Sequence, residues 1–300
     1  MKNLIEYIFF RTLSFIAAIL PRRVTLALGR LMGKLAFYLD SRHRKTSINN
    51  LKLAFKGTLN AQQRREIAKD AFSHFGQIIM ELFKAPHLNK EKIEEIAEYR
   101  GLENLRKAYN KGEGVLIFTG HFGNWELMGI AQGYLNLPLN VLARPLDNPY
   151  LEGMLRRIRS SSNCKIIYKK NAVKEILQAL KRKEAVAILI DQNTRREEGI
   201  FIDFFGEKAC TTSLLASLAL RTGASMIPAF CLPRKDGSYL FIYEKEVEFL
   251  KSGKREEDIL RLTQQCSKRV EDYVRKYPQY WFWMHRRWKN QPNSSSQRKR

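Results

Sequence analysis

The chain of 300 residues has only four cysteines, and no two of them are close enough in sequence to form a metal-binding pair. Cys164, Cys210, Cys231 and Cys266 follow one another at intervals of 46, 21 and 35 residues. Zinc sites and redox motifs use closer spacings such as C-x2-C. We therefore expect no metal site, and we expect four buried, apolar thiols in a protein of a reducing compartment.

Several common catalytic motifs are absent as well. The sequence contains no GxSxG nucleophile elbow, no phosphate-binding P-loop, no GxGxxG fingerprint and no HExxH zinc motif. A serine nucleophile is therefore not indicated. We expect an enzyme that works without a cofactor, by direct transfer rather than through an acyl-enzyme.

Acidic residues are scarce beside basic ones. The 53 Lys and Arg residues against 30 Asp and Glu give a formal net charge of +23. Such a surface attracts polyanions, which include nucleic acid, an anionic membrane and an acidic protein. No RNP-like, zinc-finger or helix-turn-helix signature accompanies the charge, and the basic residues flank apolar segments. A basic nucleic-acid-binding protein therefore stays a remote alternative, and we expect no nucleic acid as partner.

The longest apolar stretch lies at the N-terminus. Residues 4–20 form a run of 17 residues that Arg11 interrupts and Pro21 ends. A membrane span needs about 20 apolar residues, and a signal peptide needs a cleavage site that is missing here. Residues 1–56 hold eleven basic and two acidic residues, a net charge of +9. This pattern favours attachment to an anionic leaflet; a single span or an ordinary buried helix are the alternatives.

Short apolar strands alternate with helices through the rest of the chain. GVLIFT (114–119) and AVAILI (185–190) are typical of buried strands, and Asn60 is placed to cap a helix over residues 61–83. Further strands are predicted at 140–143, 165–168, 225–230 and 239–247, and further helices at 102–109, 149–160, 172–180, 211–221 and 256–276.

This alternation predicts an α/β fold. We expect a mostly parallel central sheet with helices on both faces, and additional N-terminal membrane-associated helices. The expected organisation is a membrane-associating segment at 1–56, one α/β domain at 57–290 and a disordered polar tail at 291–300.

Two strand ends carry the candidate chemistry. GVLIFT runs into Gly120-His121-Phe122-Gly123-Asn124-Trp125-Glu126, and AVAILI runs into Asp191-Gln192-Asn193. Sites in open α/β sheets gather at the carboxyl ends of strands. His121 and Glu126 are about 140° apart on a continuous helix, so they meet only if His121 lies in a turn and Glu126 in the first helical turn. A carboxylate beside an imidazole makes a general base, although a purely structural His–Glu hydrogen bond is the alternative.

Several ordered motifs carry a resemblance to a known family. The chain resembles the secondary, lauroyl/myristoyl-type lipid A biosynthesis acyltransferases of the bacterial inner membrane, within the lysophospholipid-acyltransferase-like superfamily. The resemblance covers residues 1–290 and rests on HFGNWE (121–126), ARPLDNP (143–149), IRSSSN (158–163), DQN (191–193), FFGEKACTTSLLASLALRTGASMIP (204–228) and YWFWMHRRWK (280–289).

The resemblance implies an activity and its partners. A fatty acyl chain is expected to pass from an acyl carrier protein or CoA thioester, as co-substrate, to a hydroxyl of a lipid A precursor. The cytoplasmic face of the inner membrane is the expected location. Acyl carrier protein is acidic, and lipid A precursors carry phosphates, so the charge of +23 suits both. The same family also acts on other glycolipids, such as a mannosylated phosphoinositide, which remains an alternative acceptor.

The resemblance also assigns roles. His121 and Glu126 are the expected catalytic pair, in which His121 Nε2 takes the proton of the acceptor hydroxyl and Glu126 orients the ring. The expected substrate-binding residues are Arg159, Asp191, Asn124 and Arg144. Arg159, with Arg156 and Arg157 as alternative matches to the same family arginine, is expected to contact a phosphate or the acyl donor, or else to be a solvated helix charge. Asp191 either holds Arg159, lines the site or caps its strand. For residues 280–289 we favour core packing over headgroup docking.

Overall fold

The computed structural model describes residues 1–162, 164–168 and 172–292. Its core is a seven-stranded sheet in the order β1-β9-β8-β2-β5-β3-β4. Strands β8, β2, β5, β3 and β4 are mutually parallel, whereas β9 runs antiparallel to β8, and β1 is parallel to β9. The bounds are β1 Ala97–Arg100, β2 Val115–Thr119, β3 Leu139–Ala143, β4 Lys165–Tyr168, β5 Ala185–Leu189, β8 Ser225–Pro233 and β9 Tyr239–Tyr243. The expected α/β fold with a mostly parallel sheet is confirmed.

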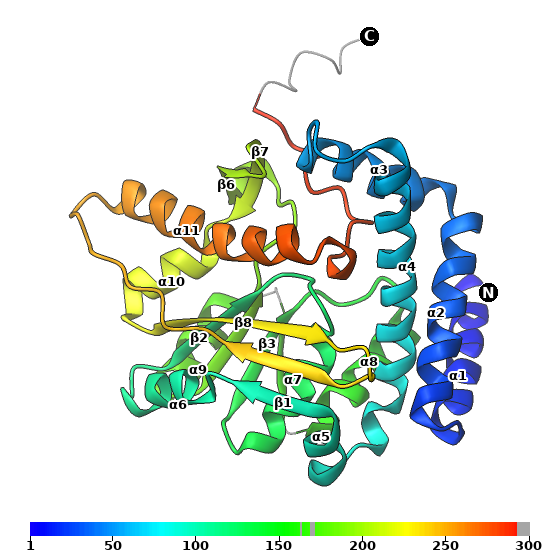
Figure 1. Ribbon diagram of the computed structural model, residues 1–300. Helices are drawn as coiled ribbons and strands as arrows, with labels where there is room; N and C mark the ends of the chain where they lie inside the picture. Colours follow the sequence, from blue (N-terminus) through cyan, green and yellow to red (C-terminus); the bar gives the residue numbers. More distant parts are fainter. Residues whose placement is uncertain (163, 169–171, 293–300) are drawn as a thin grey trace.

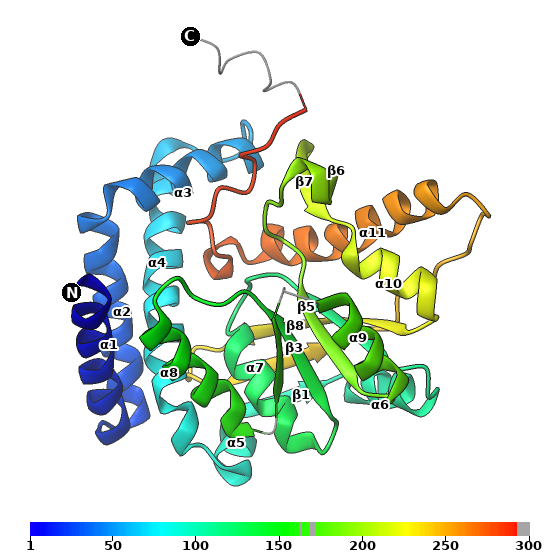
Figure 2. The ribbon, with the colours of Figure 1, turned by 180° about the vertical axis from the view of Figure 1, so that it is seen from behind.

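Helices cover both faces of this sheet (Figures 1 and 2). Because alternate residues of a strand point to opposite faces, Leu116 and Phe118 pack in one core cluster and Val115 and Ile117 in another. The first face carries α9 Ala172–Lys181, α10 Leu214–Thr222 and α11 Arg255–Lys276. The second carries α5 Lys90–Ile96, α6 Leu102–Asn110 and α7 Trp125–Gln132, and α8 Pro149–Arg159 lies beside α7.

The N-terminal helices pack as a layer along α4 (Figure 1). This layer consists of α1 Lys2–Ile19, α2 Arg22–Leu39, α3 Ser41–Ala54 and α4 Ala61–Lys84. The predicted cap of α4 is present, since Asn60 and Gln63 form a reciprocal capping box. Helices α2 and α4 approach so closely that a Cβ on Gly33 would lie 2.1 Å from the carbonyl oxygen of Phe72. Within the described ranges, no helix combines the length and the apolar character that crossing a bilayer requires.

Most predicted elements lie within one or two residues of the observed ones, with three differences. The strand expected over 225–230 (β8) continues to Pro233. The helix expected from residue 211 begins at Leu214, because Glu207–Thr212 (β7) pairs with Gly199–Phe204 (β6) as an antiparallel hairpin. The strand expected over 239–247 ends at Tyr243. The expected polar tail at 291–300 falls almost wholly outside the described residues.

The aromatic-basic run at 280–289 closes the core, which confirms the packing interpretation. Trp281, Trp283 and Arg287 are at most 1% exposed. Arg287 donates to the carbonyl oxygens of Gln192 and Cys210, at 3.0 Å each, and so ties the segment after β5 to β7. All four cysteines are free and buried, as expected.

Candidate active site

The turn between β2 and α7 is a tight corner wedged against other elements. Gly123 has φ +58°, and a Cβ there would lie 1.6 Å from the carbonyl oxygen of Cys231 in β8, so only glycine fits. Phe282 donates its backbone N–H to the carbonyl oxygen of His121 at 3.0 Å. Asn124 caps α7 by accepting from the backbone N–H of Leu127 at 3.0 Å. His121 therefore lies in the turn and Glu126 in the first helical turn, as the spacing requires.

The carboxylate that holds the His121 ring belongs to Asp191. His121 Nδ1 lies 2.7 Å from Asp191 Oδ1, and the His121 backbone N–H donates to Oδ2 at 2.6 Å. Trp281 Nε1 donates to the same Oδ2 at 2.7 Å. Strands β2 and β5 are neighbours with Thr119 opposite Leu189, so the residues two positions beyond each strand meet. This geometry corrects the expectation that Glu126 orients His121.

Asp191 is ionised in this arrangement. Its side chain is fully buried, and burial alone would raise its pKa. The charge of His121 and the hydrogen bonds from His121 and Trp281 outweigh burial and hold the pKa of Asp191 well below its usual range. When the ring is neutral, an Nδ1–H that donates to Asp191 leaves the lone pair on Nε2. The side-chain amide nitrogen of Gln192 lies 3.1 Å from that Nε2, and the ring is 15% exposed.

Glu126 is instead paired with Arg159. Arg159 donates from Nε to Oε2 at 3.0 Å and from Nη2 to Oε1 at 2.5 Å, a two-point ion pair between α7 and the end of α8. Both side chains are less than one-fifth exposed. Burial opposes the charge of Arg159, but Glu126 outweighs it and raises the arginine's pKa. Arg159 is thus neither a solvated helix charge nor held by Asp191.

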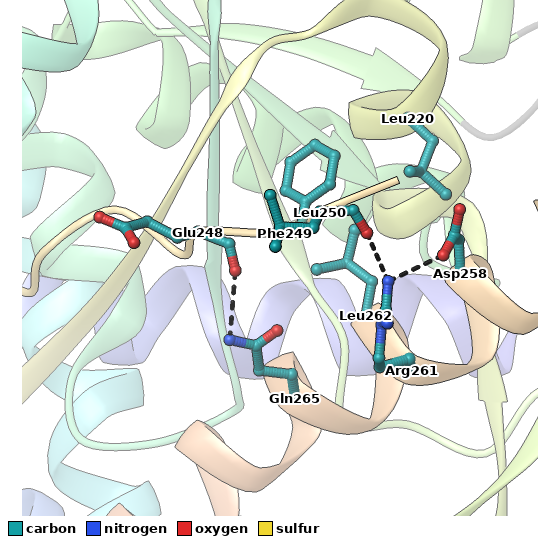
Figure 3. Close-up of a pocket in the computed structure, with 8 residues that line it drawn as sticks. All are labelled: Leu220, Glu248, Phe249, Leu250, Asp258, Arg261, Leu262 and Gln265. Atoms are coloured by element: carbon teal, nitrogen blue, oxygen red, sulfur yellow. Dashed lines mark hydrogen bonds and ion pairs between the residues drawn. The ribbon is translucent and has the colours of Figure 1, made fainter. Parts of the chain in front are cut away.

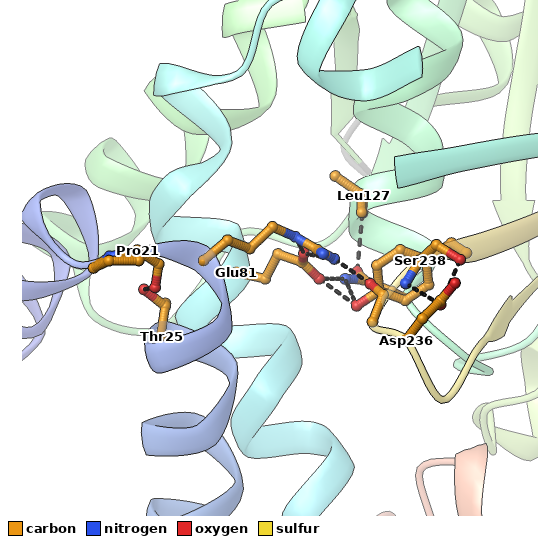
Figure 4. A network of polar contacts seen from close by, with 10 residues as sticks. Pro21, Thr25, Glu81, Leu127, Asp236 and Ser238 are labelled. Atoms are coloured by element: carbon orange, nitrogen blue, oxygen red, sulfur yellow. Dashed lines mark hydrogen bonds and ion pairs between the residues drawn. The ribbon is translucent and has the colours of Figure 1, made fainter. Parts of the chain in front are cut away.

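Asn124 faces the protein interior. It is 1% exposed, and its Nδ2 donates to Glu81 Oε2 at 2.8 Å and to the Tyr239 hydroxyl at 3.3 Å. Glu81 also pairs with Arg22 of α2 (Figure 4). The oxygen and the nitrogen of the Asn124 amide both form hydrogen bonds within the protein, so Asn124 is not free to bind a substrate as expected. Burial raises the pKa of Glu81, and Arg22 offsets this only in part.

A cavity of about 560 Å³ opens at the carboxyl edge of the sheet. His121, Glu126, Arg159 and Gln192 line it together, and Arg144 lies on its wall as a mostly exposed side chain paired with Asp147 at 3.2 Å. Asp191 and Asn124 lie behind this lining. The imidazole of His121 and the half-buried Arg159–Glu126 ion pair therefore line the same cavity. Across the described chain, no three His, Cys, Asp or Glu side chains gather closely enough to hold a metal ion.

A second cavity, of about 430 Å³, lies between α10, α11 and the segment after β9 (Figure 3). Its lining polar groups bond to one another: Arg261 donates to the Leu250 carbonyl oxygen and to Asp258, and Gln265 donates to the Glu248 carbonyl oxygen. Since β9 runs antiparallel to β8, this segment lies at the amino end of the parallel strands. It is therefore remote from His121.

Sequence reasoning missed three residues that shape the site. Gln192 could have been found, because it follows Asp191 directly at the strand end. Trp281 bonds Asp191 from 90 positions away, and Glu81 bonds Asn124 from 43 positions away. No local pattern in the sequence indicates contacts of that range.

Comparison with known proteins supports the resemblance. Residues 2–290 match the family described as bacterial lipid A biosynthesis acyltransferase. The lipid A biosynthesis palmitoleoyltransferase of Escherichia coli (strain K12) is 28% identical over 92% of this chain and 89% of its own length. The lipid A biosynthesis lauroyltransferase of the same strain is 28% identical over 91% and 88%. A phosphatidylinositol mannoside acyltransferase of Mycolicibacterium smegmatis is 22% identical over 74% and 72%.

The match to the family covers nearly the whole chain and includes both strand ends that build the cavity. The protein is therefore an enzyme that belongs to the bacterial lipid A biosynthesis acyltransferase family.

Proposed function

We propose that this enzyme transfers a fatty acyl chain from a thioester to a hydroxyl of a lipid A precursor, with His121 as the general base. One observation carries the proposal: the buried Asp191 carboxyl lies 2.7 Å from His121 Nδ1, and the His121 ring lines a cavity that Arg159 also lines. The similarity to a palmitoleoyltransferase and a lauroyltransferase of lipid A biosynthesis supports the choice of acceptor.

The reaction needs two proton transfers, one from the acceptor hydroxyl to His121 and one from His121 to the leaving group. His121 Nε2 takes the proton of the acceptor hydroxyl as its oxygen attacks the thioester carbonyl carbon. The C–S bond then breaks, the ester forms, and the imidazolium returns its proton to the leaving thiolate. The ionised Asp191 fixes the ring tautomer and stabilises the imidazolium between the two transfers. No acyl-enzyme is required.

Arg159 serves substrate binding in this proposal. Glu126 occupies Nε and Nη2 of its guanidinium, and within the described part of the chain no hydrogen bond engages Nη1. Guanidinium donors match phosphate oxygens well, and lipid A precursors and acyl carrier thioesters both carry phosphate. Glu126 thereby acts as a positioning residue that holds Arg159 against the cavity.

The N-terminal layer supports attachment to the inner membrane. Helix α1 exposes Leu4, Ile5, Ile8, Phe9, Phe15 and Ile19, and α2 exposes Val24, Leu31, Leu35, Tyr38 and Leu39. Arg11, Arg23, Arg30 and Lys34 lie among them. Helix α1 contacts the start of α8 beside the cavity wall, where Asn148 donates to the carbonyl oxygen of Asn3 at 2.9 Å. A lipid held under α1 and α2 would thus lie next to the cavity, on an anionic leaflet that attracts basic side chains.

An acyl carrier protein or CoA carries the acyl group in this proposal, since both are anionic and this chain carries +23. Mass spectrometry of lipids from a deletion strain tests the whole proposal. A lipid A species lighter by one secondary acyl chain is expected. Loss of an acyl chain from a mannosylated phosphoinositide, with lipid A unchanged, would assign the enzyme to the alternative acceptor.

A further inference from the structure

Below the β2–α7 turn that carries His121, the cavity continues as an apolar channel. Ile117 of β2, Ala187 of β5 and Val141 of β3 line it, and the register places these three residues side by side. Because their side chains point to the same face of the sheet, they form one continuous wall. Leu139, one step deeper on β3, lines it as well. The five residues from Ala143 to Leu139 span about 13 Å along the strand direction.

Helix α7 forms the opposite wall, and its middle is a glycine. Gly129 lines the cavity, and a Cβ built on it meets no atom of the described residues within 4 Å. A glycine inside a helix weakens the helix, and here neither close packing nor a positive φ requires it. The space next to Gly129 is the channel itself, about one helical turn below Glu126.

A polar floor ends the channel. Gln132, one turn further along α7, lines it and is 2% exposed. Its Oε1 accepts from the Tyr243 hydroxyl at 3.3 Å, while its Nε2 has no hydrogen-bond partner among the described residues. Gln132 thus marks the depth at which the lining along α7 becomes polar.

We propose that this channel receives the hydrocarbon tail of the transferred acyl group, and that Gly129 sets the chain length the enzyme accepts. The inference rests on the proposed acyl transfer and adds its specificity. With the thioester carbonyl beside His121, the tail runs between the sheet wall and α7 past Gly129. A side chain at position 129 would fill the path, so that only shorter tails fit.

Competition among thioesters tests the inference. Purified full-length protein receives a lipid A precursor and an equimolar series of saturated acyl carrier protein thioesters of increasing chain length, and mass spectrometry reads the product esters. Gly129→Ala and Gly129→Leu are compared with Gly153→Leu. Gly153 is a matched control, since it too lies within a helix, α8, with no described atom within 4 Å of its Cβ, yet it does not line the cavity.

The preferred chain is expected to shorten in Gly129→Leu and, to a smaller extent, in Gly129→Ala. The rate ratio of long to short chains should fall about tenfold or more for each methylene that no longer fits. Gly153→Leu should keep the wild-type profile. An unchanged profile in active Gly129→Leu and Gly129→Ala would overturn the channel assignment, and a profile shifted equally by Gly153→Leu would do the same. Absence of any transfer by the wild-type enzyme would instead contradict the proposed function.

Discussion

At the scale of single residues, the two carboxylates of the site have different roles, because each one holds a different side chain. Asp191 is fully buried and holds the imidazole, whereas Glu126 faces the cavity and holds Arg159. The H-x4-E spacing alone predicts that His121 pairs with Glu126, because both residues lie in one motif. In the structure His121 pairs with Asp191 instead, because β2 and β5 are adjacent and in register.

These two tasks predict different kinetic defects. Asp191→Asn should lower kcat about 10²–10⁴-fold, since it removes the support of the general base. Glu126→Gln should mainly raise KM, because Arg159 loses its ion pair and its position. Steady-state kinetics with varied donor and acceptor measures both. A Glu126→Gln enzyme with the same loss of kcat as Asp191→Asn and an unchanged KM would show that Glu126 shares the role of Asp191.

Two buried histidines predict how stability depends on pH. Burial lowers the pKa of His74 and of His285 to about 4, below the usual value near 6.5. Between about pH 6.5 and pH 4, each of these histidines therefore takes up a proton in the unfolded chain but stays neutral in the folded chain. The two histidines leave the free energy of unfolding at its highest value above about pH 6.5. The free energy then falls as the pH drops toward 4, by about 1.4 kcal/mol per pH unit for each histidine.

Denaturant unfolding at several pH values measures this slope. His74→Gln should reduce the slope between pH 6.5 and 4 by about one proton, or about 1.4 kcal/mol per pH unit. Its ring lies 5.0 Å from that of Tyr280, bonds the backbone of Gly123 and does not line the cavity, so unfolding rather than acyl transfer is the readout of this variant. A slope identical to that of the wild type would contradict the assignment of His74 as a buried neutral group.

At the scale of elements, one polar cluster joins α2, α4 and β9 to the start of α7, beside the turn that carries His121. The Glu81 carboxylate of α4, labelled in Figure 4, joins Arg22 of α2, Asn124 at the start of α7 and Tyr239 of β9. Glu81 is 1% exposed, so the loss of one partner leaves a buried charge or donor without compensation.

Glu81→Ala should therefore destabilise the fold by about 3–5 kcal/mol. The double variant Arg22→Ala/Glu81→Ala should cost less than the sum of the two single variants, because the second substitution removes a group that is already unpaired. Chemical denaturation of the four proteins measures this coupling. Strict additivity would contradict a direct interaction between Arg22 and Glu81.

Sequence patterns predict these elements well where a local signal exists. The apolar runs of β2 and β5 and the Asn60 cap of α4 are of this kind. Strand β1 and the β6–β7 hairpin carry mixed polar sequences such as AEYR and EKACTT, so they were not predicted. The histidine–aspartate pair depends on which strands are neighbours, and short-range patterns do not encode sheet order.

At the scale of the whole molecule, α1 lies beside α8 (Figure 2), and Leu155 and Arg159 of α8 line the cavity. Ile5, Phe9 and Phe15 of α1 are each more than half exposed. Helix α1 also packs on α4, where Lys84 Nζ donates to the carbonyl oxygens of Ala17 and Leu20. The exposed face is thus held in a fixed position relative to the site.

Replacement of Ile5, Phe9 or Phe15 by Ser should weaken binding to anionic vesicles about tenfold or more per side chain, since each loses the burial of a large apolar group. Sedimentation with vesicles at low and high salt measures it. Leu250→Ser is the control, because Leu250 is 85% exposed but lies beside the second cavity. Equal losses in the control and in the α1 variants would contradict attachment through this face.

Single-turnover transfer by His121→Ala tests the catalytic assignment most directly. Enzyme in excess over acyl carrier thioester is mixed with a lipid A precursor, and product ester is followed by mass spectrometry. The rate should fall about 10²–10⁴-fold, because the proton acceptor is removed, while vesicle binding stays near that of the wild type. A rate within twofold of the wild type would contradict His121 as the base.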